Sequence, residues 1–120
     1  MIHVGDRVLS LNDFSSILFK EKEVVLDKVA VEKVEHNFRF LRSFSSNKLI
    51  YGINTGFGPM AQYKVNEENL LQLQYNLIRS HSSGGGNLMS PIMVKALMLA
   101  RLNSLMQAYS GVHPETVELL

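Results

Sequence analysis

The apolar positions between residues 27 and 43 recur at helical spacing. Val31, Val34, Phe38 and Leu41 follow one another at intervals of three and four, with polar residues between them. Such a repeat places the apolar side chains on one side of a helix. We therefore predict an amphipathic helix from about residue 27 to about residue 43, with Asp27 as its N-cap.

A second helix is predicted to open at Asn66. Leu70, Leu73 and Leu77 mark one apolar face after the polar run NEEN. Three consecutive glycines follow at positions 84 to 86. Because glycine is unfavourable inside a helix, this helix must end before them.

Ser90 and Pro91 indicate the start of a third helix. Serine is a good N-cap, and proline fits the first helical position because its missing N–H would have no partner there. The residues that follow are apolar on several sides, so we expect a largely buried helix that reaches about Tyr109. Gly111 would end it, and His113-Pro114 is expected to begin a further helix.

Short extended segments are expected near the N-terminus. Residues 8 to 13 are predicted to be extended and to lead into a helix that ends near residue 19, with Asn12 or Asp13 as its N-cap. The run from Val24 to Leu26 is typical of a strand, and we predict that it pairs with residues 8 to 13 as a small hairpin-like element. Residues 49 to 51 are predicted to form another short strand before a loop.

Length and composition indicate a folded globular protein. The chain has 120 residues, 46% of them hydrophobic and 19% charged, so we expect a single domain over residues 1–120. A net charge of +1 with dispersed lysines and arginines gives no basic face, and nucleic acid is not an expected partner. Because the sequence has no cysteine, no export signal and no long apolar run, we expect a cytoplasmic protein that does not insert into a membrane.

The stretch YGINTGFGP, residues 51 to 59, is the first candidate for chemistry. Its glycines allow a ligand to approach the backbone, and Tyr51 supplies a titratable phenol. The alternative is a glycine-rich turn beside a core tyrosine. The pattern is neither a dinucleotide fingerprint nor a Walker loop, so a phosphate-binding domain ranks below other interpretations.

The second candidate is Ser80-His81, at the predicted end of a helix and before the glycine turn. The pair is either a substrate contact or a cap for the last carbonyls of the helix. His3, His36, His81 and His113 are scattered without the spacing of metal ligands. We therefore expect no metal site.

Three blocks of the sequence together carry a family resemblance. They are YGINTGFG, LQLQYNLIRSH and ARLNSLMQAYSGV, and the likeness spans Leu9 to Leu120. In this order and spacing they resemble the N-terminal region of histidine ammonia-lyase and of the related phenylalanine and tyrosine ammonia-lyases. The resemblance implies a mainly α-helical fold with a small β element, as the N-terminal segment of an aspartase/fumarase-like lyase.

The resemblance also implies roles for individual residues. Tyr51 matches the base that takes the β-proton of an aromatic amino acid, and Gly56 and Gly58 match loop positions where the backbone approaches the substrate. Ser80-His81 matches the pair beside the substrate ring, and a polar pair favours L-histidine, which yields urocanate. The alternatives are tyrosine, which yields coumarate, and a non-catalytic interaction module with the lyase fold.

The electrophile of this family is a methylidene-imidazolone formed from an internal Ala-Ser-Gly. This chain contains no Ala-Ser-Gly, so no external cofactor is expected and the 120 residues alone are predicted to be inactive. The family's enzymes are homotetramers, which makes other copies of the chain the expected partners. An apolar terminus with Val117, Leu119 and Leu120 unpartnered indicates a truncated chain.

Overall fold

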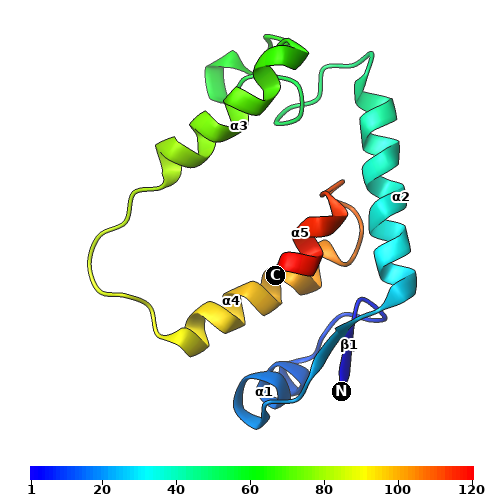
Figure 1. The fold of residues 1–120 in the computed structure, drawn as a ribbon, viewed down its shortest axis with the longest axis vertical. Coiled ribbons are helices and arrows are strands. Elements are labelled where there is room, and N and C mark those ends of the chain that lie inside the picture. Colours follow the sequence, from blue (N-terminus) through cyan, green and yellow to red (C-terminus); the bar gives the residue numbers. More distant parts are fainter. The chain divides into compact units, whose positions relative to one another are not determined.

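The computed structural model describes all 120 residues apart from the side chain at position 67. The described chain is mainly α-helical with one pair of short strands, as the resemblance predicted (Figure 1). Its elements are β1 (Ile2–Val4), α1 (Leu11–Lys20), β2 (Val24–Leu26), α2 (Lys28–Ser45), the 3-10 turn η1 (Gly58–Met60), α3 (Glu67–His81), α4 (Pro91–Leu105) and α5 (Pro114–Leu119).

The chain divides into two compact units. Unit 1 consists of Met1–Leu41 and Leu88–Leu120, and unit 2 consists of Arg42–Asn87. The expectation of a single domain over residues 1–120 stays a prediction. Both candidate stretches, YGINTGFGP and Ser80-His81, belong to unit 2.

The strand pair of unit 1 differs from the expected one. β1 and β2 run parallel, with Ile2 opposite Val24 and Val4 opposite Leu26. The prediction of a hairpin-like pair with residues 8 to 13 was wrong, because Ser10 caps a helix there instead of extending a strand. Parallel strands need a crossover connection, and α1 supplies it.

The cap of α1 is Ser10, and not Asn12 or Asp13 as predicted. The Asp13 backbone N–H donates to Ser10 Oγ at 3.3 Å, and the Ser10 backbone N–H donates to the Asp13 carboxylate at 2.8 Å. This reciprocal arrangement satisfies two backbone donors that the helix itself leaves unpaired. The true cap therefore lies where the sequence reads Ser-x-x-Asp.

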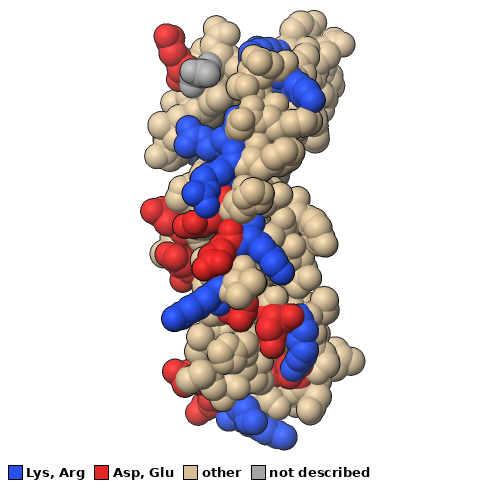
Figure 2. Space-filling view, turned by 90° about the vertical axis from the view of Figure 1, so that its right-hand side faces the viewer, with Lys and Arg blue, Asp and Glu red and all other residues tan. Residues whose placement is uncertain are grey.

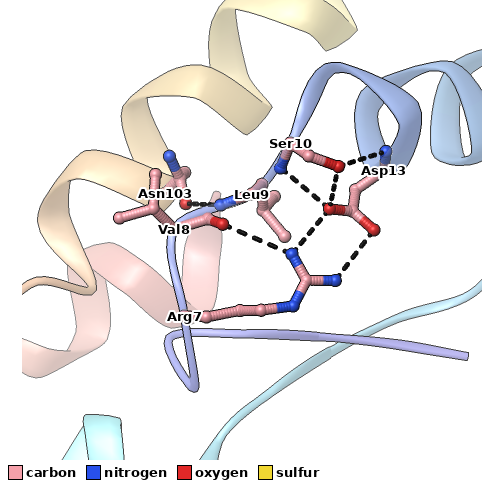
Figure 3. Close-up of polar contacts among 6 residues, drawn as sticks. All are labelled: Arg7, Val8, Leu9, Ser10, Asp13 and Asn103. Atoms are coloured by element: carbon pink, nitrogen blue, oxygen red, sulfur yellow. Dashed lines mark hydrogen bonds and ion pairs between the residues drawn. The ribbon is translucent and has the colours of Figure 1, made fainter.

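Arg7 and Asn103 hold this cap in place (Figure 3). The Arg7 guanidinium donates to both carboxylate oxygens of Asp13, at 2.7 and 3.0 Å. That contact, with the hydrogen bonds from Ser10, holds the pKa of Asp13 well below its usual range. The Leu9 backbone N–H donates to Asn103 Oδ1 at 3.0 Å, which links the start of α1 to α4.

The apolar core lies in unit 1. It is formed by residues from both of its chain segments, namely Val4, Leu9, Ala30, Val34, Leu99, Leu102, Leu105, Met106 and Val117. The predicted apolar face of α2 is confirmed by the burial of Val34, and Asp27 is confirmed as its cap by accepting the Ala30 N–H at 2.9 Å. Val117 is only 1% exposed, so the expectation that it lacks a partner was wrong.

The third predicted helix is shorter and less covered than expected. It begins at Pro91 as predicted but ends at Leu105 instead of near Tyr109. Ala108 adopts a left-handed φ of 60°, which a continuing α-helix does not allow. Three leucines on one side are buried, whereas Met93 and Leu97 are more than half exposed.

The surface carries charges of both signs. On the face drawn in Figure 2, acidic and basic side chains lie beside one another among a larger area of uncharged residues. Within the part of the chain that is described, no helix is long and apolar enough to cross a bilayer.

Candidate active site

The loop that carries Tyr51 is a series of turns. Residues 49 to 51 do not form the predicted strand, and only Thr55 and Lys64 make an isolated antiparallel bridge. The Ile53 and Asn54 backbone N–H groups both donate to the Ile50 carbonyl, at 3.1 and 3.2 Å. Because these groups are used within the turn, they are not available for strand pairing.

The side chain of Asn54 organises this loop. Its Oδ1 accepts the Ile50 N–H at 2.8 Å, and its Nδ2 donates to the carbonyls of Ser45 and Lys48 at 2.9 and 2.7 Å. The residue is only 7% exposed. One buried amide therefore joins the end of α2 to the turn beside Tyr51. Sequence reasoning gave Asn54 no role, although asparagine in a turn is a known sign of side-chain to backbone bonding.

Thr55 and Gly56 fix the next part of the loop. Thr55 is 1% exposed, and its Oγ1 donates to the Gly56 carbonyl at 2.9 Å. A Cβ at Gly56 would lie 2.7 Å from Cβ and 2.8 Å from the backbone oxygen of Met60, so only glycine fits. The structure thus gives Gly56 a packing reason that the resemblance did not suggest.

Gly58 is in a different situation. Its φ is +56°, and a Cβ there would meet nothing within 4 Å. The residue is exposed at the start of η1, so its backbone is open to a ligand. The predicted substrate contact at Gly58 stays a prediction.

Tyr51 presents its phenol to solvent. The residue is 64% exposed, and its ring makes an edge-to-face contact with the Phe57 ring, with centroids 6.2 Å apart and planes at 83°. Edge-to-face contact of this kind orients a ring without covering its hydroxyl. The alternative of a core tyrosine is wrong, and the catalytic role of Tyr51 stays a prediction.

Ser80 and His81 lie in the last turn of α3, where they cap its carbonyls. Ser80 Oγ donates to the Leu77 carbonyl at 2.9 Å, and His81 Nδ1 lies 2.9 Å from that same oxygen and 3.0 Å from Ser80 Oγ. A carbonyl oxygen only accepts, so Nδ1 donates to Leu77 in the tautomer that carries the proton on this nitrogen. In the neutral ring, Nε2 is then a hydrogen-bond acceptor.

The two candidate stretches stand at opposite ends of α3. The Tyr51 loop is joined to the residues just before α3, since the Val65 N–H donates to the Asn54 carbonyl at 2.9 Å. His81 is the last of the 15 residues of α3, about 22 Å along the axis of the helix. In the described part of unit 2, no hydrogen bond or ring contact joins Tyr51 to Ser80 or His81. The structure therefore positions both stretches without bringing them together.

The side chains and sequence motifs present determine which metal or cofactor the chain could hold. Among the described residues, no three His, Cys, Asp or Glu side chains form a group that could hold a metal ion. The sequence has no Ala-Ser-Gly, so the residues present do not include the precursor of a methylidene-imidazolone. The site offers an exposed phenol on a loop held by hydrogen bonds, and an imidazole in the last turn of α3.

Comparison with known proteins identifies the relatives of the chain. The family model described as "Aromatic amino acid lyase" matches residues 9–120. A tyrosine 2,3-aminomutase of Chondromyces crocatus is 41% identical over 93% of this chain and 21% of its own length. A histidine ammonia-lyase of Streptococcus pyogenes is 36% identical over the whole chain and 24% of its own length.

Solved structures agree with the sequence matches. A tyrosine aminomutase from Streptomyces globisporus superimposes with a TM-score of 0.86 at 30% identity, over 98% of this chain and 22% of its own. The chain thus spans between a fifth and a quarter of the length of these relatives. With a family match over nearly all of its residues, the chain belongs to the aromatic amino acid lyase family.

Proposed function

We propose that this chain forms part of an enzyme that eliminates ammonia from an aromatic L-amino acid, with L-histidine as substrate and urocanate as product. The observation that carries the proposal is the exposed Tyr51 phenol on a loop held by the buried amide of Asn54. The family membership of residues 9–120 supports it. Other copies of the chain, in a homotetramer, are its proposed partners.

The reaction needs a base near the β-carbon of the substrate. The phenolate of Tyr51 would take the β-proton, and the C–H electron pair would form the Cα–Cβ double bond. The protonated amino group would leave as ammonia with the electron pair of the C–N bond. Positive charge in the assembled site would have to stabilise the phenolate near neutral pH. Gly58, with an open and left-handed backbone, lets the loop lie close to the substrate.

His81 supplies the ring contact in this proposal. With its Nδ1 proton directed to Leu77, Nε2 can accept a hydrogen bond from the imidazole N–H of histidine. Ser80 lies beside it with a hydroxyl 3.0 Å from the imidazole. A polar pair at this place favours a polar ring over a phenyl ring, because an apolar ring would leave these groups unpaired.

Tyrosine is the second candidate substrate. The same Nε2 can accept a hydrogen bond from a phenol, and two of the relatives reported above are named for tyrosine. Both of those relatives are named aminomutases, a name for enzymes that move an amino group within a molecule. Product analysis with both amino acids separates elimination from such a shift.

Replacing the base tests the proposal directly. In a full-length protein that carries this segment, Tyr51→Phe should lower kcat by about 10²- to 10⁴-fold, the range for one positioned proton transfer, while folding persists. Tyr63→Phe is the matched control, because Tyr63 is a similarly exposed tyrosine in the same unit and should keep its activity. Near-normal turnover of a folded Tyr51→Phe protein would remove Tyr51 from the mechanism.

Replacing the ring contact tests the substrate. Changing Ser80 to Phe and His81 to Leu should raise kcat/KM for phenylalanine relative to histidine and tyrosine, because apolar surface replaces two polar groups. Ratios that do not change would show that this pair does not contact the ring.

The 120-residue chain alone provides a further test. It supplies a base and a ring contact but not the Ala-Ser-Gly from which the electrophile forms. We therefore expect no absorbance from urocanate or coumarate when the purified chain is incubated with histidine or tyrosine. Sustained turnover would contradict the need for that electrophile.

A further inference from the structure

The Tyr51 and Phe57 rings face each other across a short turn of unit 2. Their centroids lie 6.2 Å apart with the ring planes at 83°, within the range in which aromatic pairs attract edge to face. The Phe57 ring also reaches the residue after Tyr51, since a Cβ at Gly52 would lie 3.9 Å from Cε1 of Phe57. Phe57 therefore lies against both the Tyr51 ring and the backbone next to it.

Phe57 is held more firmly than Tyr51. Its carbonyl accepts the Met60 N–H at 3.1 Å, and the preceding Gly56 N–H donates to the Tyr63 carbonyl at 3.2 Å. Gly56 is itself packed against Met60, with no space for a Cβ. Phe57 is partly buried, whereas Tyr51 is 64% exposed. The Phe57 ring is thus the fixed partner of the pair, and the Tyr51 side chain is the one with space to rotate.

A base for proton transfer has to be held in one orientation. An exposed tyrosine exchanges among three staggered χ1 arrangements, which point its hydroxyl in different directions. An edge-to-face contact multiplies the weight of one arrangement by about fivefold. If the three are otherwise equal, the favoured one rises from about a third to about 70% of the population. The contact therefore increases the correctly oriented fraction of Tyr51 about twofold.

We propose that Phe57 is a positioning residue for Tyr51, and that its ring holds the phenol in one orientation through their edge-to-face contact. The proposal rests on the function proposed above, because the orientation of the phenol matters to the reaction only if Tyr51 takes the β-proton. Phe57 acts through Tyr51 and not on the substrate. Its removal should therefore lower kcat and leave KM nearly unchanged.

NMR spectroscopy of the 120-residue chain measures the orientation without turnover. In wild type, the Hα–Hβ couplings of Tyr51 should show one dominant χ1 arrangement, with nuclear Overhauser effects between the Tyr51 and Phe57 rings. Phe57→Leu should bring these couplings close to the average of the three arrangements. Phe57→Tyr keeps an aromatic ring at this place and should keep the wild-type couplings.

Tyr75→Leu is the matched control for the loss of an aromatic ring. Tyr75 is a half-exposed tyrosine of α3 in the same unit, with its ring beside Arg79. Because it is not part of the turn that joins the two rings, its replacement should leave the Tyr51 couplings unchanged. A general loosening of unit 2 by the loss of any aromatic side chain would instead alter them.

Amide exchange shows whether the loop persists in Phe57→Leu. The Val65 N–H, which donates to the Asn54 carbonyl, should be as protected as in wild type. If that protection is lost, Phe57→Met takes the place of Phe57→Leu, because a flexible apolar side chain fills irregular space without supplying a ring edge. The same averaged couplings are expected.

Kinetics of a full-length protein that carries this segment test the link to the reaction. Phe57→Leu should lower kcat about two- to threefold, and Phe57→Tyr should keep the wild-type kcat. In a Tyr51→Phe background, Phe57→Leu should have no further effect, because the base that it orients is gone. A residue that contacts the substrate itself would still lower kcat in that background.

Three results would overturn the proposal. They are averaged Tyr51 couplings in wild type, unchanged couplings in a folded Phe57→Leu chain, and a loss of kcat in Phe57→Leu that is equally large in the Tyr51→Phe background. Normal turnover of Tyr51→Phe would refute the proposed function instead. The couplings would still decide whether Phe57 orients Tyr51, so the two failures are distinguishable.

Discussion

Replacing Asn54 with aspartate should loosen the loop that carries Tyr51. The substitution keeps the size of the side chain and the acceptor for the Ile50 N–H, but it removes both donors to the carbonyls of Ser45 and Lys48. At neutral pH it also places a carboxylate, only slightly exposed, opposite two carbonyl oxygens. Any loss of order should therefore centre on the turn from Ser45 to Asn54.

The size of the effect follows from these contacts. Each lost hydrogen bond is worth about 1 kcal/mol, and the buried carboxylate adds at least as much again. We expect a total of about 3 kcal/mol, which is roughly a hundredfold increase in the open form of the loop. In a full-length protein that carries the segment, kcat should fall as well, because Tyr51 would be held less firmly.

Amide hydrogen exchange of the 120-residue chain measures the opening directly. The N–H groups of Ile50, Asn54 and Val65 should exchange about a hundredfold faster in Asn54→Asp, while those of α4 should not change. Asn47→Asp is the matched control, since Asn47 is an exposed residue of the same turn region. Equal exchange in the two variants would refute the organising role of Asn54.

The pH dependence gives a second check on the same variant. Burial opposite two carbonyls should raise the pKa of the introduced aspartate above that of an unfolded chain. The part of the destabilisation that comes from the buried charge should therefore be absent below the unfolded pKa and should grow as the pH rises from there through the folded pKa. A penalty that does not depend on pH would show that the lost donors, not the buried charge, account for the whole effect.

Three further predictions concern unit 1. Gly111→Ala should destabilise the chain by about 2–4 kcal/mol in urea unfolding, because the φ of Gly111 is +61° and the new Cβ would overlap the Leu41 side chain. The strained φ alone would cost about 1 kcal/mol, so a smaller change than this would contradict the overlap. Ala108→Gly should stabilise the chain by about 1 kcal/mol, because Ala108 holds a left-handed φ of 60°. A thermal midpoint lower than that of wild type would contradict backbone strain at this position. The guanidinium of Arg7 lowers the pKa of Asp13, so the stabilisation by Asp13 should be present above the unfolded pKa and lost as the pH falls through the folded pKa. If the unfolding midpoint of Asp13→Asn depends on acid pH in the same way as that of wild type, this contribution of Asp13 is excluded.

The features that the sequence predicted well are those set by neighbouring residues. Asp27 caps α2 and Pro91 begins α4 because a cap or a first-turn proline acts within three or four residues. The cap of α1 was misplaced because Ser10, Asn12 and Asp13 are all good caps. The reciprocal bonds between Ser10 and Asp13 decide among them.

The features that were missed depend on contacts between distant residues. The partner of β2 is β1, and nothing in either run of three residues specifies a parallel pair across α1. Asn54 bonds to carbonyls six and nine residues away, so its role depends on the path of the loop. The same limit applies to Tyr51 and His81, which the resemblance assigns to one site but which local patterns cannot bring together.

The segregation of the core has a consequence for how this protein can change. The residues of unit 2 interrupt unit 1 in the sequence, yet they contribute none of the buried apolar side chains described. Substitutions around Tyr51 or Ser80-His81 therefore leave the main interior intact, and their cost is confined to an inserted segment. A chain built in this way can accept substitutions in unit 2 with little effect on the buried apolar residues of unit 1.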